Sequence, residues 1–158
     1  MADPDAPPEG SLKARLAEEM RTAMKAREKI RLSALRMLAA AIKNREVDVG
    51  HGLSDDEVVD VAIREVKRRQ EAMDAFERAG RPDRVAQERE EREILQAYLP
   101  DRLSDDEVGA LIDEAIATTG ASGPGDMGKV MGLVMSKAKG RVDGRVVQER
   151  VRSRLADP

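Results

Sequence analysis

Three lysines near the end of the sequence, Lys129, Lys137 and Lys139, have the chemistry needed to bind a polyanion. They accompany an apolar pattern with the i, i+3, i+4, i+7, i+8 spacing of one face of an α-helix. That pattern consists of Met127, Val130, Met131, Val134 and Met135. Because successive residues are about 100° apart around a helix, the three lysines fall on the opposite half. The pattern predicts a helix with one apolar and one basic face, and the basic face either binds phosphates or is simply solvated.

The same helix contains two glycines, Gly128 and Gly132, which stand four residues apart. Each glycine lowers helix stability by about 1 kcal/mol relative to alanine. A glycine inside a helix usually has a packing or functional reason, such as the close approach of another helix or of a ligand. Asp126 precedes the helix and is predicted to be its N-cap, because its carboxylate can accept hydrogen bonds from the first turn. The sequence alone does not decide between packing and binding at the glycines.

Chemistry that depends on cysteine or on several histidines is absent from the sequence. There is no cysteine, which excludes disulfides, thiolate catalysis and cysteine-based metal sites. The single histidine, His51, lies between two glycines in a predicted loop and has no histidine or cysteine partner for zinc. No phosphate-binding glycine loop or nucleophile motif occurs. We predict no autonomous catalytic site, no metal and no cofactor, and enzymatic activity within a larger complex stays open.

The net charge of −3 argues against a general nucleic-acid binder, but the charge is unevenly distributed. Residues 11–50 carry +5, residues 54–100 carry −4, residues 101–123 carry −5 and residues 124–158 carry +4. Two basic segments can form a local patch for a polyanion in spite of the acidic total. Lys29, Arg36 and Lys43 also recur every seven residues and form one ridge, which either contacts phosphates or is solvated.

Helical periodicity with 1% aromatic and 37% charged residues predicts an all-α fold. We expect about seven helices, four before Pro100 and three after it. Leu53-Ser54-Asp55-Asp56-Glu57-Val58 and Leu103-Ser104-Asp105-Asp106-Glu107-Val108 are identical, and each predicts a capping box. The expected helices cover residues 11–26, 28–47, 54–79 and 82–99, then a fifth that ends at Gly120, a sixth that ends at Gly140 and a seventh that begins near Asp143.

Pro100 cannot continue the helix before it and marks the predicted domain boundary. We expect a disordered lead-in at residues 1–10, an N-terminal helical domain at residues 11–100 and a three-helix domain at residues 101–158. No apolar run approaches the roughly 20 residues that span a bilayer, and the N-terminus lacks the features of a signal peptide. With the absence of cysteine, this predicts a cytoplasmic protein without a membrane partner.

Several motifs together resemble the YqeY-like family. From residue 99 onward these are Leu99-Pro100 with Leu103-Ser104, the run Gly125-Asp126-Met127-Gly128-Lys129-Val130-Met131-Gly132, and Lys139-Gly140-Arg141-Val142-Asp143-Gly144. Earlier in the chain they are Arg31-Leu32-Ser33-Ala34-Leu35-Arg36 and Phe76-Glu77-Arg78-Ala79-Gly80-Arg81. The helices after Pro100 are also similar to the tail domain of the GatB component of the glutamine-dependent aspartyl/glutamyl-tRNA amidotransferase. The resemblance covers nearly everything after the first ten residues.

This resemblance implies a free-standing relative of a tRNA-binding tail that is non-catalytic by itself, with tRNA or the amidotransferase machinery as its partner. It implies possible tRNA contacts at Lys129, Lys137, Lys139, Arg141 and Arg145. It also implies a structural motif of Asp126, Met127, Gly128, Met131 and Gly132, in which the glycines are expected to serve close helix packing. Two alternatives stay open. The chain could be a component of carbon–nitrogen ligase activity with glutamine as the amide donor, or a helical adaptor that binds an acidic protein.

Overall fold

The computed structural model describes residues 3–156, and within them the fold is all-α, as predicted. Seven α-helices and one short 3₁₀ helix occur there, and no strand does. The chain divides into two compact units, Met1–Leu99 and Pro100–Pro158. Each unit has its own apolar core. Of the predicted lead-in, residues 1 and 2 lie outside the described part, and residues 3–10 contain two turns.

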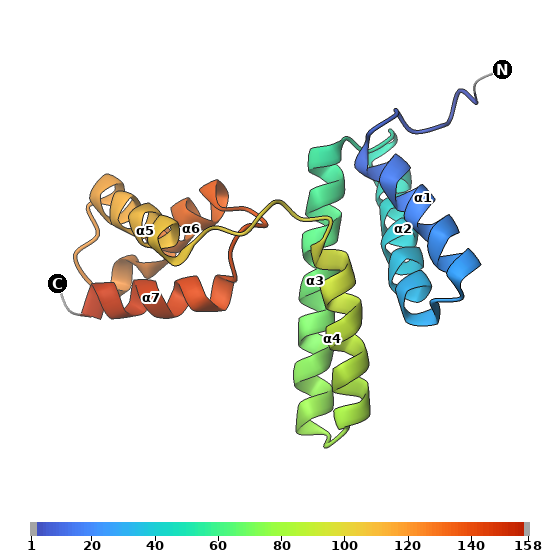
Figure 1. Cartoon of the computed structure of the whole chain (residues 1–158). Coiled ribbons are helices and arrows are strands. Elements are labelled where there is room, and N and C mark those ends of the chain that lie inside the picture. Colours follow the sequence, from blue (N-terminus) through green and yellow to red (C-terminus); the bar gives the residue numbers. More distant parts are fainter. Residues whose placement is uncertain (1–2, 157–158) are drawn as a thin grey trace. The chain divides into compact units, whose positions relative to one another are not determined.

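The first unit contains α1 (Leu12–Ala26), α2 (Lys29–Val49), α3 (Asp55–Arg78) and α4 (Pro82–Gln96). The central helix is α2, which packs against the other three. Figure 1 shows that α3 and α4 form a hairpin whose tip extends beyond α1 and α2. The core is aliphatic apart from one aromatic residue, and its largest fully buried side chains are those of Leu35, Leu38, Val58, Leu95 and Tyr98.

The second unit contains α5 (Asp105–Thr119), the 3₁₀ helix η1 (Pro124–Asp126), α6 (Met127–Lys137) and α7 (Gly144–Ala156). The helix α6 packs against both α5 and α7. Its buried residues Val130 and Val134 join Ile112 of α5 and Val147 and Val151 of α7 in one core.

The repeated six-residue motif begins α3 and α5 in the same way. The Ser104 hydroxyl accepts a hydrogen bond from the Glu107 N–H (3.2 Å), and the Glu107 carboxylate accepts one from the Ser104 N–H (2.8 Å). Ser54 and Glu57 make the same pair of bonds at the start of α3. Both predicted capping boxes are confirmed. Gly120 ends α5 with a φ of +67°, in the left-handed region that glycine enters without steric cost.

Two helix ends differ from the prediction by three residues each. The fourth helix ends at Gln96 rather than near Leu99, because Tyr98 and Leu99 close a turn with bonds to Leu95 and Gln96. The sixth ends at Lys137 rather than Gly140.

A polar contact fastens the end of α4 to α1. The buried Tyr98 hydroxyl donates a hydrogen bond to Glu19, and the Arg15 guanidinium lies 4.6 Å from the centre of the Tyr98 ring. Arg15 also donates to Glu19 at 2.8 Å, and Arg31 lies 3.5 Å from the same carboxylate. Burial alone would raise the pKa of Glu19, but the hydrogen bonds from Tyr98 and Arg15 outweigh it and the pKa is lowered.

The substitution Tyr98→Phe should lower the free energy of unfolding of the first unit by about 1–3 kcal/mol, because it removes a hydrogen bond to a charged group. A carboxylate whose pKa is lowered on folding stabilises the fold above its unfolded pKa, and this stabilisation is lost as the pH falls through the folded pKa. The difference between wild type and variant in urea unfolding should therefore shrink in acid. An equal loss of stability at pH 7 and in acid would contradict this assignment.

Candidate nucleic-acid interface

The orientation of α6 is set by its apolar side. Val130 and Val134 are buried, and the methionines of the motif, Met127 and Met131, pack partly against the same core. The opposite side, which we call the α6 outer face, consists of four exposed residues: Gly128, Lys129, Gly132 and Ser136. The predicted division into an apolar and a polar face is present, and one of the three lysines, Lys129, belongs to the outer face.

The two glycines of this face do not serve helix packing, contrary to the expectation. A Cβ atom built at Gly128 or Gly132 would have no heavy atom within 4 Å other than its local helix backbone. Both residues are exposed, and neither has a positive φ. The physical reason is their angular position, because both point away from the side of α6 that meets α5 and α7. Within the described chain, nothing requires glycine at either position.

Asp126 occupies the N-cap position of α6, as predicted, but its carboxylate makes no capping bond to the first turn, which corrects that part of the prediction. The turn of η1 places its carboxylate back toward the preceding loop, where it accepts a hydrogen bond from the Ser122 N–H at 3.0 Å. This bond is the largest cause of the lowered pKa of Asp126, and the charge of Lys129 lowers it further. Asp126 therefore fixes the loop that leads into α6 and carries a negative charge near Lys129.

The remaining predicted cations do not share one surface. Lys137 turns toward α5 and forms an ion pair with Glu114 (Nζ to Oε1, 2.6 Å). Lys139 is exposed in the turn after α6, and Arg145 is exposed in the first turn of α7, where its N–H binds the Asp143 carboxylate at 2.9 Å. Lys129, Lys139 and Arg145 have exposed side chains, and Lys137, which is also exposed, is paired with Glu114.

Arg141 holds the unit together rather than projecting into solvent. Its side chain is half-buried, and its Nε donates to the Asp101 carbonyl at 2.9 Å. Its own carbonyl accepts from the Leu103 N–H at 2.8 Å. These two bonds attach the turn between α6 and α7 to the segment that precedes α5. Substitution of Arg141 would therefore remove a bond that stabilises the unit as well as a charge.

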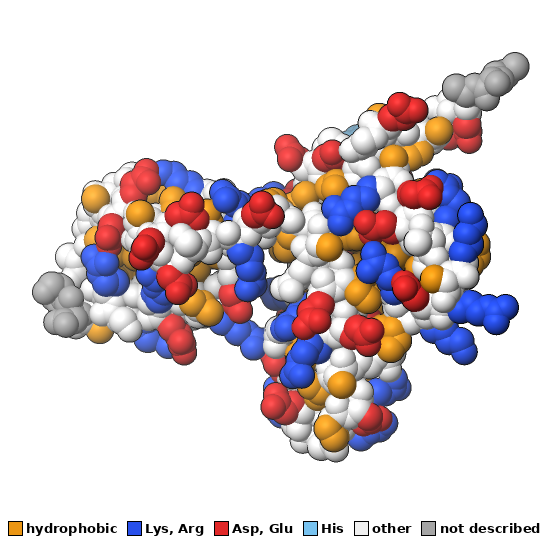
Figure 2. All heavy atoms as spheres, viewed as in Figure 1, with side chains coloured by type: hydrophobic (Ala, Val, Ile, Leu, Met, Phe, Trp, Pro, Cys, Tyr) orange, Lys and Arg blue, Asp and Glu red, His pale blue; other side chains and the backbone are white. Residues whose placement is uncertain are grey.

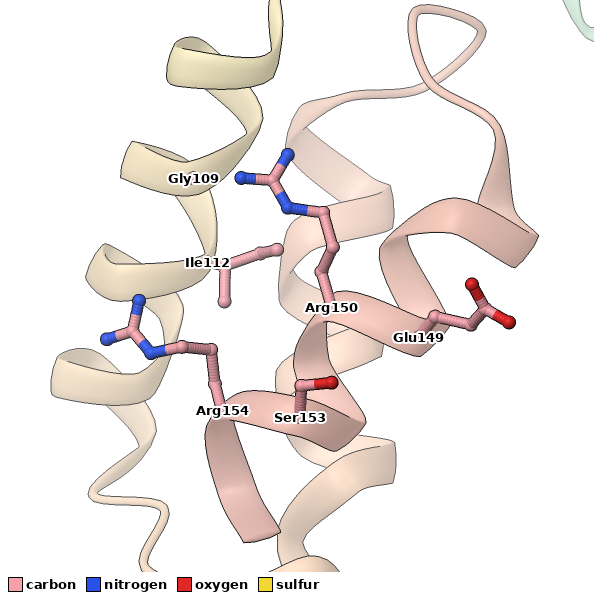
Figure 3. A pocket seen from close by; sticks show the side chains of 6 residues that line it. All are labelled: Gly109, Ile112, Glu149, Arg150, Ser153 and Arg154. Carbon is pink, nitrogen blue, oxygen red and sulfur yellow. The ribbon is translucent and has the colours of Figure 1, made fainter. Parts of the chain in front are cut away.

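Sequence reasoning missed two arginines of α7, Arg150 and Arg154. Figure 3 shows Arg150 and Arg154 extending from α7 toward α5, on either side of Ile112, while Glu149 points away. Together with Gly109 and Ser153 they line a shallow groove of about 380 Å³. Arg150 donates to the Asp105 carbonyl at 3.0 Å, and Arg154 forms an ion pair with Asp113. The Arg-rich spacing of the last helix could have indicated them.

Gly109 explains how Arg150 reaches across the groove. A Cβ atom at Gly109 would lie only 2.9 Å from one terminal nitrogen of Arg150. This glycine, unlike those of α6, therefore makes room for a neighbour in the same unit. Both arginines of the groove are committed to α5, so we assign them a structural role. Arg152, by contrast, is exposed on the outer side of α7.

Other kinds of site find no support in the described part of the chain. Among residues 3–156, no group of three or more His, Cys, Asp or Glu side chains is arranged to hold a metal ion. Over the same residues, no helix is both long enough and apolar enough to cross a bilayer.

Comparison with known proteins gives a family and three informative relatives. A family model described as Yqey-like protein matches residues 13–155. The chain is 27% identical over 147 residues to "Altered inheritance of mitochondria protein 41, mitochondrial" of Pyrenophora tritici-repentis, covering 91% of this chain and 81% of the relative. A protein of the same name from Eremothecium gossypii is 33% identical over 87 residues, covering 54% of this chain and 48% of the relative.

A relative from a different functional context is a glutamyl-tRNA(Gln) amidotransferase subunit of Thermococcus gammatolerans. It is 32% identical over 90 residues, which cover 54% of this chain and 14% of the relative. The chain therefore spans only a small part of that subunit, and about half of the Eremothecium protein. The similarity to both the family and a tRNA amidotransferase subunit agrees with the motifs of the sequence.

Because no residue of the described chain packs on them, Gly128→Ala and Gly132→Ala should each raise the free energy of unfolding of the second unit by about 0.5–1 kcal/mol. The reason is the smaller loss of backbone entropy when alanine joins a helix. Gly120→Ala is the matched control and should be destabilising, because Gly120 has a φ of +67°. Urea unfolding followed by circular dichroism measures all three. Destabilisation at Gly128 or Gly132 would show that a neighbour packs there.

Proposed function

We propose that this chain, which belongs to the YqeY-like family, is a tRNA-associated accessory protein that binds RNA through the α6 outer face and performs no chemistry alone. The observation that carries the proposal is the pair of exposed glycines on either side of Lys129. A helix surface without side chains lets a phosphate or ribose approach the backbone closely, and Lys129 supplies the charge. The similarity to a tRNA amidotransferase subunit supports RNA as the ligand.

Two further exposed cations of the second unit are included in the proposed contact. Lys139 follows α6 and Arg145 begins α7, and both have exposed side chains in the second unit. Lysine and arginine bind phosphate oxygens without regard to sequence, and the affinity then falls steeply with salt. Tyr98 is buried under Arg15 and lies in the first unit, so it is not available to stack on a base. The proposal is therefore recognition of an RNA backbone rather than of single-stranded bases.

The second candidate function is a component of glutamine-dependent carbon–nitrogen ligase activity. It is favoured by one observation, the similarity to a tRNA amidotransferase subunit of which this chain spans 14%. Such a role would require other subunits to supply the reaction, and copurification with amidotransferase subunits would support it. The predicted cytoplasmic location stays a prediction, since two relatives carry the word mitochondrial in their names.

The test is the binding of labelled total tRNA over a series of salt concentrations, with wild type beside Lys129→Gln/Lys139→Gln. Each duplex phosphate contact contributes about 0.9 to the slope of log affinity against log salt. Loss of two contacts should weaken binding and lower the slope by about 2. The matched control, Arg64→Gln/Lys67→Gln, removes two exposed positive charges from α3 and should leave the slope unchanged.

Equal effects of the two double variants would mean that net charge, and not the α6 outer face, governs binding. No binding by wild type at low salt would overturn the tRNA proposal. Circular dichroism of each variant excludes unfolding as the cause of a loss.

A further inference from the structure

A second surface, whose charged residues are all of one sign, lies on α2 in the first unit. Six exposed residues form a line along this helix, which we call the α2 stripe: Lys29, Ser33, Arg36, Ala40, Lys43 and Val47. Their spacing alternates between four and three residues. This is the heptad spacing with which one side of a helix contacts a partner helix. The stripe is about 27 Å long. The other sides of α2 are covered by α1, α3 and α4, so the α2 stripe is the side that remains open.

The charged residues of the α2 stripe are all basic. Residues 29–45 contain five Lys or Arg and no Asp or Glu, in a chain with 31 acidic residues. Lys29 and Arg36 form no ion pair with any residue in the described part of the chain, 3–156. Arg31, which lies off the stripe, is paired with Glu19 and Glu28 at 3.5 and 3.7 Å. In Figure 2, Lys and Arg side chains gather along the edge of the first unit where α1 and α2 lie.

The surface between the cations is apolar and slightly hollow. A groove of about 430 Å³ is lined by Leu32 and Met37 together with four residues of the α2 stripe, namely Lys29, Ser33, Arg36 and Ala40. Arg69 of α3 contacts Met37, with one terminal nitrogen of the guanidinium 3.3 Å from the Met37 sulfur. At the end of the stripe, Val47 is 73% exposed. Small residues therefore alternate with long cations over an apolar floor.

We propose that the α2 stripe is the docking site for an acidic amphipathic α-helix of a partner protein. The cations recur every seven residues, about 10.5 Å apart, and acidic residues at the same heptad spacing on a second helix would face them in register. Ser33 and Ala40 allow the partner helix to approach closely, and Leu32, Met37 and Val47 give its apolar side a surface to bury. An RNA backbone would use the cations but would leave this apolar surface exposed, so a helix fits better.

This inference does not depend on the proposed tRNA function. The α2 stripe belongs to the first unit, whereas the α6 outer face belongs to the second. A variant of either surface can therefore fail in its own assay without affecting the other. The tRNA assay with variants of α2 separates the two proposals directly.

The experiment measures fluorescence anisotropy of a labelled synthetic helical peptide that spans three heptads, with leucine at each a position and glutamate at each d position. The full chain is the titrant, and a scrambled peptide of the same composition is the control ligand. Lys29→Glu/Arg36→Glu should weaken binding of the heptad peptide at least about tenfold, which is about 1.4 kcal/mol. Arg64→Glu/Lys67→Glu makes the same charge change on α3 and should alter it much less.

Ala40→Arg separates docking from general charge attraction. It adds a positive charge, so non-specific attraction predicts tighter binding of the acidic peptide. A docked helix requires space above Ala40, so our proposal predicts binding at least about tenfold weaker. Ala40 is exposed, so this variant should fold even if Lys29→Glu/Arg36→Glu does not.

Three results would overturn the proposal. The first is tighter peptide binding by Ala40→Arg, and the second is equal binding of the scrambled peptide. The third is loss of tRNA binding, without loss of peptide binding, in Lys29→Glu/Arg36→Glu, which would identify the α2 stripe as an RNA surface.

Discussion

The burial of Val130 and Val134 is the constraint on which the account of the second unit depends. With so few aromatic residues, this small unit must build its core from aliphatic side chains of three helices, so α6 has no freedom to rotate. Once those valines face α5 and α7, Gly128, Lys129 and Gly132 must face outward. Each glycine lowers helix stability, and no packing within the described part of the unit compensates for that loss. We therefore connect the glycines to a ligand rather than to the fold.

Pairing of charges distinguishes structural cations from candidate binding cations. In the second unit, Lys137 and Arg154 are paired with carboxylates of α5, and Arg141 binds a carbonyl before α5. Such contacts hold the helices in place and reduce the positive charge available to a partner. In the first unit, Lys29 and Arg36 have no carboxylate partner in the described part of the chain. The two proposed surfaces also differ in chemistry. The α6 outer face exposes the backbone at two glycines, whereas the α2 stripe lies beside apolar side chains.

Local patterns predicted the helices well and the side-chain contacts between distant segments poorly. Ser54 and Ser104 with the glutamates three residues later indicated two helix starts, because a capping box involves only neighbouring residues. The same periodicity placed Val130 and Val134 in the core. Asp126 lies at the predicted N-cap position, but the 3₁₀ turn at Pro124 directs its carboxylate to the Ser122 N–H instead of the first turn of α6. The bond of Arg141 to Asp101 joins residues forty positions apart, and no local pattern records such a contact.

The central claim is that Gly128 and Gly132 keep the α6 outer face open for an RNA backbone. The most direct measurement is tRNA binding by Gly128→Leu/Gly132→Leu beside the corresponding alanine pair, at one salt concentration. Neither pair changes the charge, and leucine is a good helix former, so the unit should stay folded. We predict that the leucine pair weakens binding at least about tenfold, or about 1.4 kcal/mol, and that the alanine pair has a smaller effect. Binding by the leucine pair at wild-type affinity would contradict the claim.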